Sequence, residues 1–194
     1  MTINKIKEGK LLYHLTKLEN LDSIIKNGLL PRKYAKDLKF CDVANPEIIE
    51  KRSKFNLDKY TPFHFHPYSA FDVAVKGTYS EDDFIYICIK RQLAKQNNFK
   101  ILPKHPLSIN ECSLLEYDNG FNEIDWDAMQ TSGNEDEYIK HVKMAECVTD
   151  LRIPVEKFFC IYVKDEKNKK IVEDMLTENG LKFPPPFVNI QKWF

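Results

Sequence analysis

The chain has 194 residues, a formal net charge of zero and 43% apolar residues, which suits a single globular domain over residues 1–194 with a full core. This neutral balance argues against tight, charge-driven binding to duplex nucleic acid. No stretch is apolar enough to span a membrane and the first residues do not open a signal peptide, so we expect a cytoplasmic protein with no membrane contact.

The first third of the chain predicts a strand, a helix and a second helix. Residues 11–15 are apolar and strand-like, and residues 16–19 have the form of a capping box that starts a helix at Thr16. Apolar residues then follow at helical spacing until Gly28, which we expect to end that helix. The pair Asn45-Pro46 predicts the start of a helix that runs through Arg52.

The rest of the chain predicts mainly short strands, with helices between them. We expect strands at 63–67, 84–89, 99–102, 146–148, 158–163 and 187–190, and helical turns around Trp126 and over 136–144. Asp165 is placed to cap a last helix that ends at Asn179-Gly180. Because several strands follow one another late in the chain, the order favours an α+β fold over a doubly wound parallel sheet.

Cysteines and charges are spread unevenly. The five cysteines contain no C-x-x-C pair, and those at 88, 147 and 160 lie in apolar runs, so we expect buried thiols in a reducing compartment and no metal site.

Residues 90–104 hold five basic and no acidic residues, whereas 111–137 hold nine acidic and no basic ones. We interpret these as solvated faces; the alternative is a basic surface that grips phosphate.

The familiar phosphate-binding, zinc-hydrolase and nucleophile motifs are absent from the sequence. Glu146 stands out because it lies within Met144-Ala145-Glu146-Cys147-Val148, where an ionised carboxylate is costly unless it is paired or used. The alternative is that Glu146 points outward from an edge strand.

Four basic side chains can also be explained without any function. His14, in Leu12-Tyr13-His14-Leu15, can be a core histidine bonded to backbone. Arg52 can be a solvated helix residue. His64 and His66 share one face of the expected strand, but no third metal ligand has a usual spacing, so a surface face is favoured over a metal site.

Several segments, in order along nearly the whole chain, resemble the DarT family of nucleic-acid ADP-ribosyltransferases. Residues 12–16, the helix with Asn20 and Gly28-Leu29 resemble the family's opening, and Glu50-Lys51-Arg52 is similar to its Glu-x-Arg segment. The segment 60–67 resembles Tyr-Val-Pro-Phe-Tyr-Phe-x-Pro. Further matches are Asp125-Trp126-Asp127-Ala128-Met129, Met144-Ala145-Glu146-Cys147-Val148 and the aromatic end Lys192-Trp193-Phe194.

The resemblance implies a split mixed or antiparallel sheet with flanking helices, and an enzyme that passes ADP-ribose from NAD to a base in single-stranded nucleic acid, most simply DNA, without a metal. Glu146 and Arg52 would be catalytic, because a carboxylate can stabilise the oxocarbenium-like transition state and a fixed cation can hold the pyrophosphate or the activated base. Aromatic residues around Phe63 and Phe65 would wall the site. The residues that would bind NAD are His14, Leu15, Thr16, Asn20 and Arg52.

The resemblance also implies a toxin with a macrodomain antitoxin as partner. The sequence departs from the family after the Pro-Phe-Tyr-Phe-x-Pro segment, where many members continue Arg-Ser-Pro-Met and this chain has Pro67-Tyr68-Ser69-Ala70-Phe71. The acceptor therefore stays open among thymine, guanine and an RNA base. A protein acceptor, plain NAD hydrolysis and a non-catalytic binding module also stay open.

Overall fold

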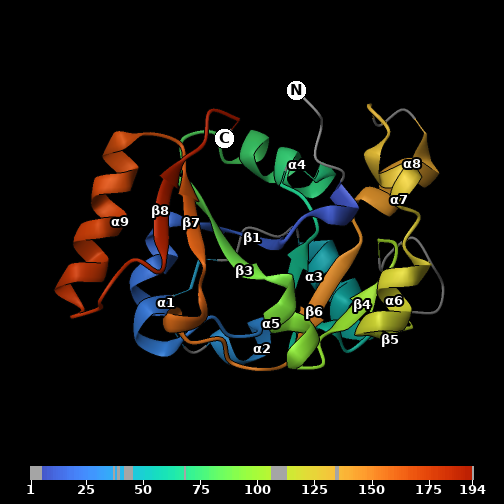
Figure 1. Ribbon diagram of the computed structural model, residues 1–194, viewed down its shortest axis with the longest axis horizontal. Coiled ribbons are helices and arrows are strands. Elements are labelled where there is room, and N and C mark those ends of the chain that lie inside the picture. Colours follow the sequence, from blue (N-terminus) through green and yellow to red (C-terminus); the bar gives the residue numbers. More distant parts are fainter. Residues whose placement is uncertain are drawn as a thin grey trace.

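The computed structural model describes residues 6–36, 38, 40–41, 46–67, 69–105, 113–133 and 136–193. Within these residues an eight-stranded sheet has the order β5-β4-β6-β2-β1-β3-β7-β8 (Figure 1). The strands are β1 (Leu11–Lys17), β2 (Thr61–His64), β3 (Phe84–Lys90), β4 (Lys100–Leu102), β5 (Leu115–Glu116), β6 (Glu146–Thr149), β7 (Cys160–Val163) and β8 (Phe187–Ile190).

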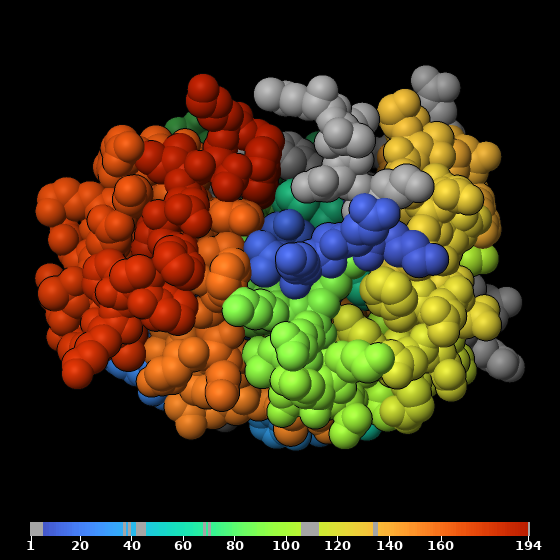
Figure 2. All heavy atoms as spheres, viewed as in Figure 1, coloured from blue at the N-terminus to red at the C-terminus, as the bar shows by residue number. Residues whose placement is uncertain are grey.

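The helices lie around this sheet, with α9 beside β8 at one end and α6, α7 and α8 at the other (Figures 1 and 2). They are α1 (Leu21–Asn27), α2 (Arg32–Ala35), α3 (Pro46–Lys54), α4 (Ala70–Thr78), α5 (Arg91–Gln96), α6 (Tyr117–Glu123), α7 (Trp126–Gln130), α8 (Glu137–Lys143) and α9 (Glu166–Glu178). Short 3-10 turns lie at Ile6–Glu8, Leu18–Asn20, Leu57–Lys59 and Val155–Lys157.

The sheet is mixed and it splits between β1 and β2. All pairs are antiparallel except β7 with β8. β1 pairs with β3 along its whole length, from Leu11↔Lys90 to Lys17↔Phe84. With β2, however, it pairs only at Tyr13↔His64. The two strands therefore diverge, and residues at the end of β1 and the start of β2 border a gap in the sheet. The α+β fold with a split mixed sheet is confirmed.

Hydrophobic clusters cover both faces of the sheet. The larger one packs α1, α5, α7 and α9 against the inner strands, with Leu12, Ile87 and Ile161 fully buried at its centre. The smaller one packs Val75 of α4 and Trp193 against Tyr86 and other residues of β1, β3 and β7. Because α4 lies over this second face, its first turn is held close to the gap between β1 and β2.

The predicted capping box at Thr16 is wrong. β1 continues through Lys17, and a 3-10 turn over Leu18–Asn20 precedes α1. Thr16 is therefore a strand residue, and its Oγ1 accepts a hydrogen bond from Asn20 Nδ2 at 3.1 Å. The helix does end at Gly28, whose φ of 79° favours glycine. A bridge between Leu29 and Ile153 follows directly.

Most other predicted elements are confirmed with shifted ends. β2 begins at Thr61 and ends at His64, so His66 lies beyond the strand rather than on its face. The helix predicted through Arg52 runs to Lys54, while Asn45 lies outside the described residues. Asp165 caps α9 as expected. The short elements α2, α4, α5, α6 and β5 were not predicted.

The basic and acidic segments pair with one another. Lys95 Nζ lies 2.7 Å from Asp118, and Lys100 forms an ion pair with Glu116 across the β4–β5 ladder. Both acidic partners are well exposed, so each pair adds at most about 1 kcal/mol to stability. The interpretation as solvated faces stands, with part of the basic surface neutralised by its neighbour.

Candidate active site

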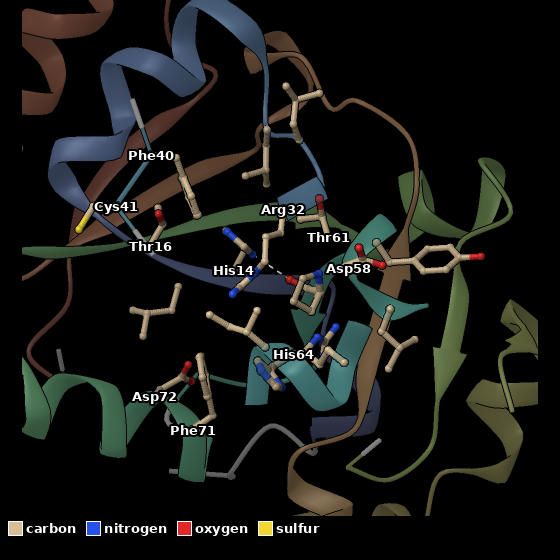
Figure 3. Close-up of a pocket in the computed structure, with 18 residues that line it drawn as sticks. His14, Thr16, Arg32, Phe40, Cys41, Asp58, Thr61, His64, Phe71 and Asp72 are labelled. Atoms are coloured by element: carbon tan, nitrogen blue, oxygen red, sulfur yellow. Dashed lines mark hydrogen bonds between the residues drawn. The ribbon is translucent and has the colours of Figure 1, made fainter. Parts of the chain in front are cut away.

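A cavity occupies the gap between β1 and β2 (Figure 3). Because β1 and β2 diverge beyond Tyr13↔His64, the last residues of β1 and the first of β2 face it instead of each other. Helices α3 and α4 and the residues Phe40 and Cys41 lie at its sides. Its lining includes His14, Leu15, Thr16, Phe40, Cys41, Arg52, Thr61, Pro62, His64, Phe71 and Asp72.

Arg52 and Glu146 form a nearly buried ion pair beside this cavity. Arg52 Nη1 donates to both carboxylate oxygens of Glu146, at 2.7 and 3.0 Å. Only 12% of the Arg52 side chain and 6% of the Glu146 side chain are exposed. β6 lies between β4 and β2, so the alternative of an outward-pointing edge residue is wrong for Glu146, and that of a solvated residue is wrong for Arg52.

Two opposing effects set the protonation of Glu146. Burial raises the pKa of this carboxyl, but the charge of Arg52 and its hydrogen bonds overcome burial and hold the pKa below its ordinary value. Glu146 is therefore an anion at neutral pH. A buried anion with a fixed cation beside it suits a reaction that develops positive charge nearby.

His14 is neutral and has a defined orientation. Burial lowers its pKa to about 4, and its Nδ1 donates to the Pro62 carbonyl oxygen at 2.8 Å. The alternative of a histidine bonded to backbone is therefore confirmed. The same residue also lines the cavity, so its Nε2 is left as a hydrogen-bond acceptor for a bound hydroxyl.

The other residues that the sequence predicted for the cofactor divide into two groups. Leu15 and Thr16 line the cavity directly. Asn20 is buried behind them, where its Nδ2 donates to Thr16 Oγ1 and to the Cys41 carbonyl oxygen, and its Oδ1 accepts from the Cys41 backbone N–H at 2.8 Å. Asn20 thus holds the segment with Phe40 and Cys41 against β1 and does not itself line the cavity.

Buried polar atoms of several cavity residues have no hydrogen-bond partner among the described residues. They include Arg52 Nη2, Thr61 Oγ1, His64 Nδ1 and Asp72 Oδ1. Buried polar groups in proteins are nearly always bonded, so a cluster of them around one cavity indicates that a polar ligand or ordered water satisfies them. The cluster combines donors with acceptors, as a ligand with hydroxyl and charged groups requires.

Three of these residues were not predicted from the sequence as parts of the site. Asp72 lies in the first turn of α4, where its Oδ2 accepts from the Ser69 backbone N–H in a capping box. The spacing Ser69-x-x-Asp72 is the sequence signal that points to this helix. The alternating segment 61–64 did point to Thr61 and His64, but only as a strand. The expected aromatic walls are wrong: Phe63 and Phe65 lie in the core, and the aromatic residues at the cavity are Phe40, Tyr60 and Phe71.

Among the described residues no group of three or more His, Cys, Asp or Glu side chains is placed to hold a metal ion. His66 is not free for a ligand, because its Nδ1 and Nε2 face the carbonyl oxygens of Pro67 and Lys143 at 2.8 and 3.1 Å. No helix within the described parts of the chain is both long and apolar enough to cross a membrane.

Comparison with solved structures gives the class of fold. Thermus sp. 2.9 DarT in complex with ADP-ribosylated ssDNA matches with a TM-score of 0.82 and 20% identity over 95% of each chain. The complex of that protein with carba-NAD+ gives 0.77 and 20% identity over 95% of this chain and 97% of the other. Thermosipho africanus DarTG in complex with ADP-ribose gives 0.72 and 19% identity over 89% and 49%. The fold is that of the DarT ADP-ribosyltransferases.

The family follows from the sequence model described as DarT, ssDNA thymidine ADP-ribosyltransferase, which matches residues 13–194. The chain belongs to the DarT family. No curated protein sequence matches it.

Proposed function

We propose that this protein cleaves the nicotinamide–ribose bond of NAD and transfers ADP-ribose to a thymidine base in single-stranded DNA. The observation that carries the proposal is the buried Arg52–Glu146 pair beside a cavity whose described residues include unpartnered polar atoms. The family description names the same reaction, and the Thermus relative is recorded with ADP-ribosylated ssDNA.

The geometry supports separate roles for His14, Glu146 and Arg52. His14 Nε2 would accept a hydrogen bond from a ribose hydroxyl, with Leu15 and Thr16 beside it in β1. Glu146 would stabilise the positive charge that develops at the anomeric carbon. Arg52 would hold Glu146 through Nη1 and present its free Nη2 to the oxygen of the base that gains negative charge.

Asn20→Ala tests whether Asn20 acts through its neighbours. We expect a several-fold rise in KM for NAD with an unchanged kcat, because Phe40 and Cys41 lose their anchor while the reacting groups stay in place. Steady-state kinetics of transfer measure both constants. Asn27→Ala is the control, since the Asn27 side chain donates to Ser23 within α1 and does not line the cavity. An equal fall in kcat and kcat/KM for Asn20→Ala would instead place Asn20 at the reacting atoms.

Two further parts of the proposal rest on the family and on composition. The related DarTG protein supports a toxin–antitoxin role, so we propose that a macrodomain antitoxin removes or blocks the modification. The free cysteines Cys88, Cys147 and Cys160 fit a reducing compartment, and the proposed substrates are in the cytoplasm. That residues 1–194 form one domain remains a prediction.

The acceptor is tested by incubating the protein with NAD labelled in its ADP-ribose part. Single-stranded DNA and RNA oligonucleotides of each base and a mixture of unfolded proteins are offered separately. We expect the label on DNA that contains thymidine and on no other acceptor. Label on polypeptide, or release of free ADP-ribose alone, would instead establish a protein acceptor or NAD hydrolysis.

A further inference from the structure

We propose that His64 is the general base of this enzyme, accepting through Nδ1 the proton that the acceptor nitrogen loses during transfer, while Glu146 remains ionised and stabilises the ribosyl cation. The inference rests on the proposed function, since it assigns the proton of that reaction. It concerns a position where this sequence departs from the similar family segment, which has tyrosine where His64 stands.

His64 lies where a base is needed. It is the last residue of β2 and the direct partner of Glu146 in β6, so the two side chains leave the same face of adjacent strands. His64 is buried, lines the cavity in the split of the sheet and lies with its ring centroid 6.3 Å from that of Phe71 (Figure 3).

The ring nitrogen that would take the proton has no hydrogen-bond partner in the protein. His64 Nδ1 is buried and has no partner among the described residues. The neighbouring histidines differ: His14 Nδ1 is bonded to the Pro62 carbonyl oxygen, and both nitrogens of His66 face backbone carbonyl oxygens. Of the three histidines around β2, His64 is the one whose Nδ1 has no hydrogen-bond partner among the described residues.

Glu146 is poorly suited to take this proton. Both of its oxygens accept hydrogen bonds from Arg52 Nη1, at 2.7 and 3.0 Å, and its pKa lies below the ordinary value. A carboxylate with a low pKa is a weak proton acceptor, whereas general bases work best when their basicity matches the working pH. An imidazole meets that condition near neutral pH. Glu146 in β6 therefore stabilises the positive charge, and His64 in the neighbouring strand β2 accepts the proton.

Bonds, electrons and the proton balance in the proposed step. The bond between the anomeric carbon and the nicotinamide nitrogen breaks, and its electron pair leaves with neutral nicotinamide. The acceptor nitrogen bonds to the same carbon, and its N–H proton moves to His64 Nδ1. The resulting imidazolium lies beside anionic Glu146, which stabilises it, and it then loses the proton to solvent.

Charged and titratable groups face His64 from each side. They are Glu146 from β6, Arg52 from α3, Asp72 from α4, His14 from β1, and His66 and His105 from the adjoining loops. Burial lowers the pKa of His66, and it lowers the pKa values of His14 and His105 to about 4. These three imidazoles stay neutral near neutral pH, so their protonation does not cause a fall in activity in that range.

The test is the pH dependence of transfer to a thymidine oligonucleotide between about pH 5 and 9, at saturating NAD. We expect wild-type kcat to fall on the acid side of this profile, because a general base that already holds a proton cannot accept another. His64→Asn keeps a polar atom near the position of Nδ1 but does not titrate, so its kcat should be about 100-fold to 10,000-fold lower and should lack the acid limb. NAD binding by calorimetry should change little.

His66→Asn is the matched control: it removes a neighbouring imidazole whose nitrogens are already engaged, and it should lower thermal stability but keep the acid limb. In His64→Ala, added imidazole should restore part of the transfer, which a structural role would not allow. A wild-type profile that is flat on the acid side, or His64→Asn with wild-type kcat, would overturn the proposal. Wild-type protein that modifies no oligonucleotide would overturn the proposed function instead.

Discussion

Glu146→Gln is expected to reduce transfer of ADP-ribose by at least about 1,000-fold, because the amide keeps the shape of the side chain but cannot oppose positive charge at the anomeric carbon. The burial of Glu146 increases this loss, because little water is present to replace its negative charge. Its partner on the adjacent strand, His64, is an imidazole and cannot supply a negative charge instead. Rates of label transfer under single-turnover conditions measure the effect.

Glu116→Gln is the matched control for this substitution. Glu116 lies in β5, on the same sheet, but its side chain is well exposed and pairs only with Lys100 at the surface. We expect unchanged transfer and a stability change within about 1 kcal/mol. Glu146→Gln should retain NAD binding and a cooperative unfolding transition. Transfer within a few-fold of wild type would remove Glu146 from catalysis.

Arg52→Ala is expected to weaken both transfer and the fold. It leaves Glu146 buried without its cation, which for a broken buried pair costs about 3–5 kcal/mol at neutral pH. Transfer should fall at least about 100-fold, since the carboxylate loses its orientation and the base loses the Nη2 donor. Denaturant titration and single-turnover transfer measure the two losses separately.

The stability lost in Arg52→Ala should depend on pH. In the wild type the depressed pKa of Glu146 contributes stability that is present above the unfolded pKa, about 4.3, and is lost as pH falls through the folded value. Without Arg52, burial alone raises the pKa of Glu146 above the unfolded value, so the variant is penalised as pH rises. The difference in unfolding free energy should therefore be largest near pH 7 and shrink toward about pH 4.

Lys54→Ala controls for loss of a cation from the same helix. Lys54 pairs with Glu50 one turn away, and both side chains are 69% exposed. It should change neither transfer nor the pH dependence of stability. If Arg52→Ala behaves like Lys54→Ala, the Arg52–Glu146 ion pair contributes neither to stability nor to transfer.

The strands and the Arg52–Glu146 ion pair could be predicted from the sequence better than the walls of the site. Glu146 could be found because a carboxylate in an apolar run requires a partner, and the structure supplies Arg52 from a helix 94 residues earlier. Sequence spacing alone does not show which cation that partner is. The ordered resemblance across the chain singled out Arg52, and the fold brings the two residues together.

The errors have local physical causes. Thr16 and Glu19 have the spacing of a capping box, but the pairing of β1 with β3 continues to Lys17↔Phe84, so the sheet ladder outweighed the helix signal. Phe63 and Phe65 have the pattern of a half-buried strand, yet they pack into the core because helices cover that face. Asp72 was missed because α4 was not predicted, although Ser69 and Asp72 have the spacing of the capping box that starts it.

The proposed reaction can be observed in a single measurement, by mass spectrometry of two single-stranded DNA oligonucleotides after incubation with NAD and the protein. The two differ only in that one contains a single thymidine where the other has cytidine. We predict one added ADP-ribose, located on the thymidine base, with wild-type protein, and none with Glu146→Gln or with the cytidine oligonucleotide. Unmodified thymidine DNA with folded, NAD-binding protein, or equal modification by Glu146→Gln, would contradict the proposed reaction and the role of Glu146 in it.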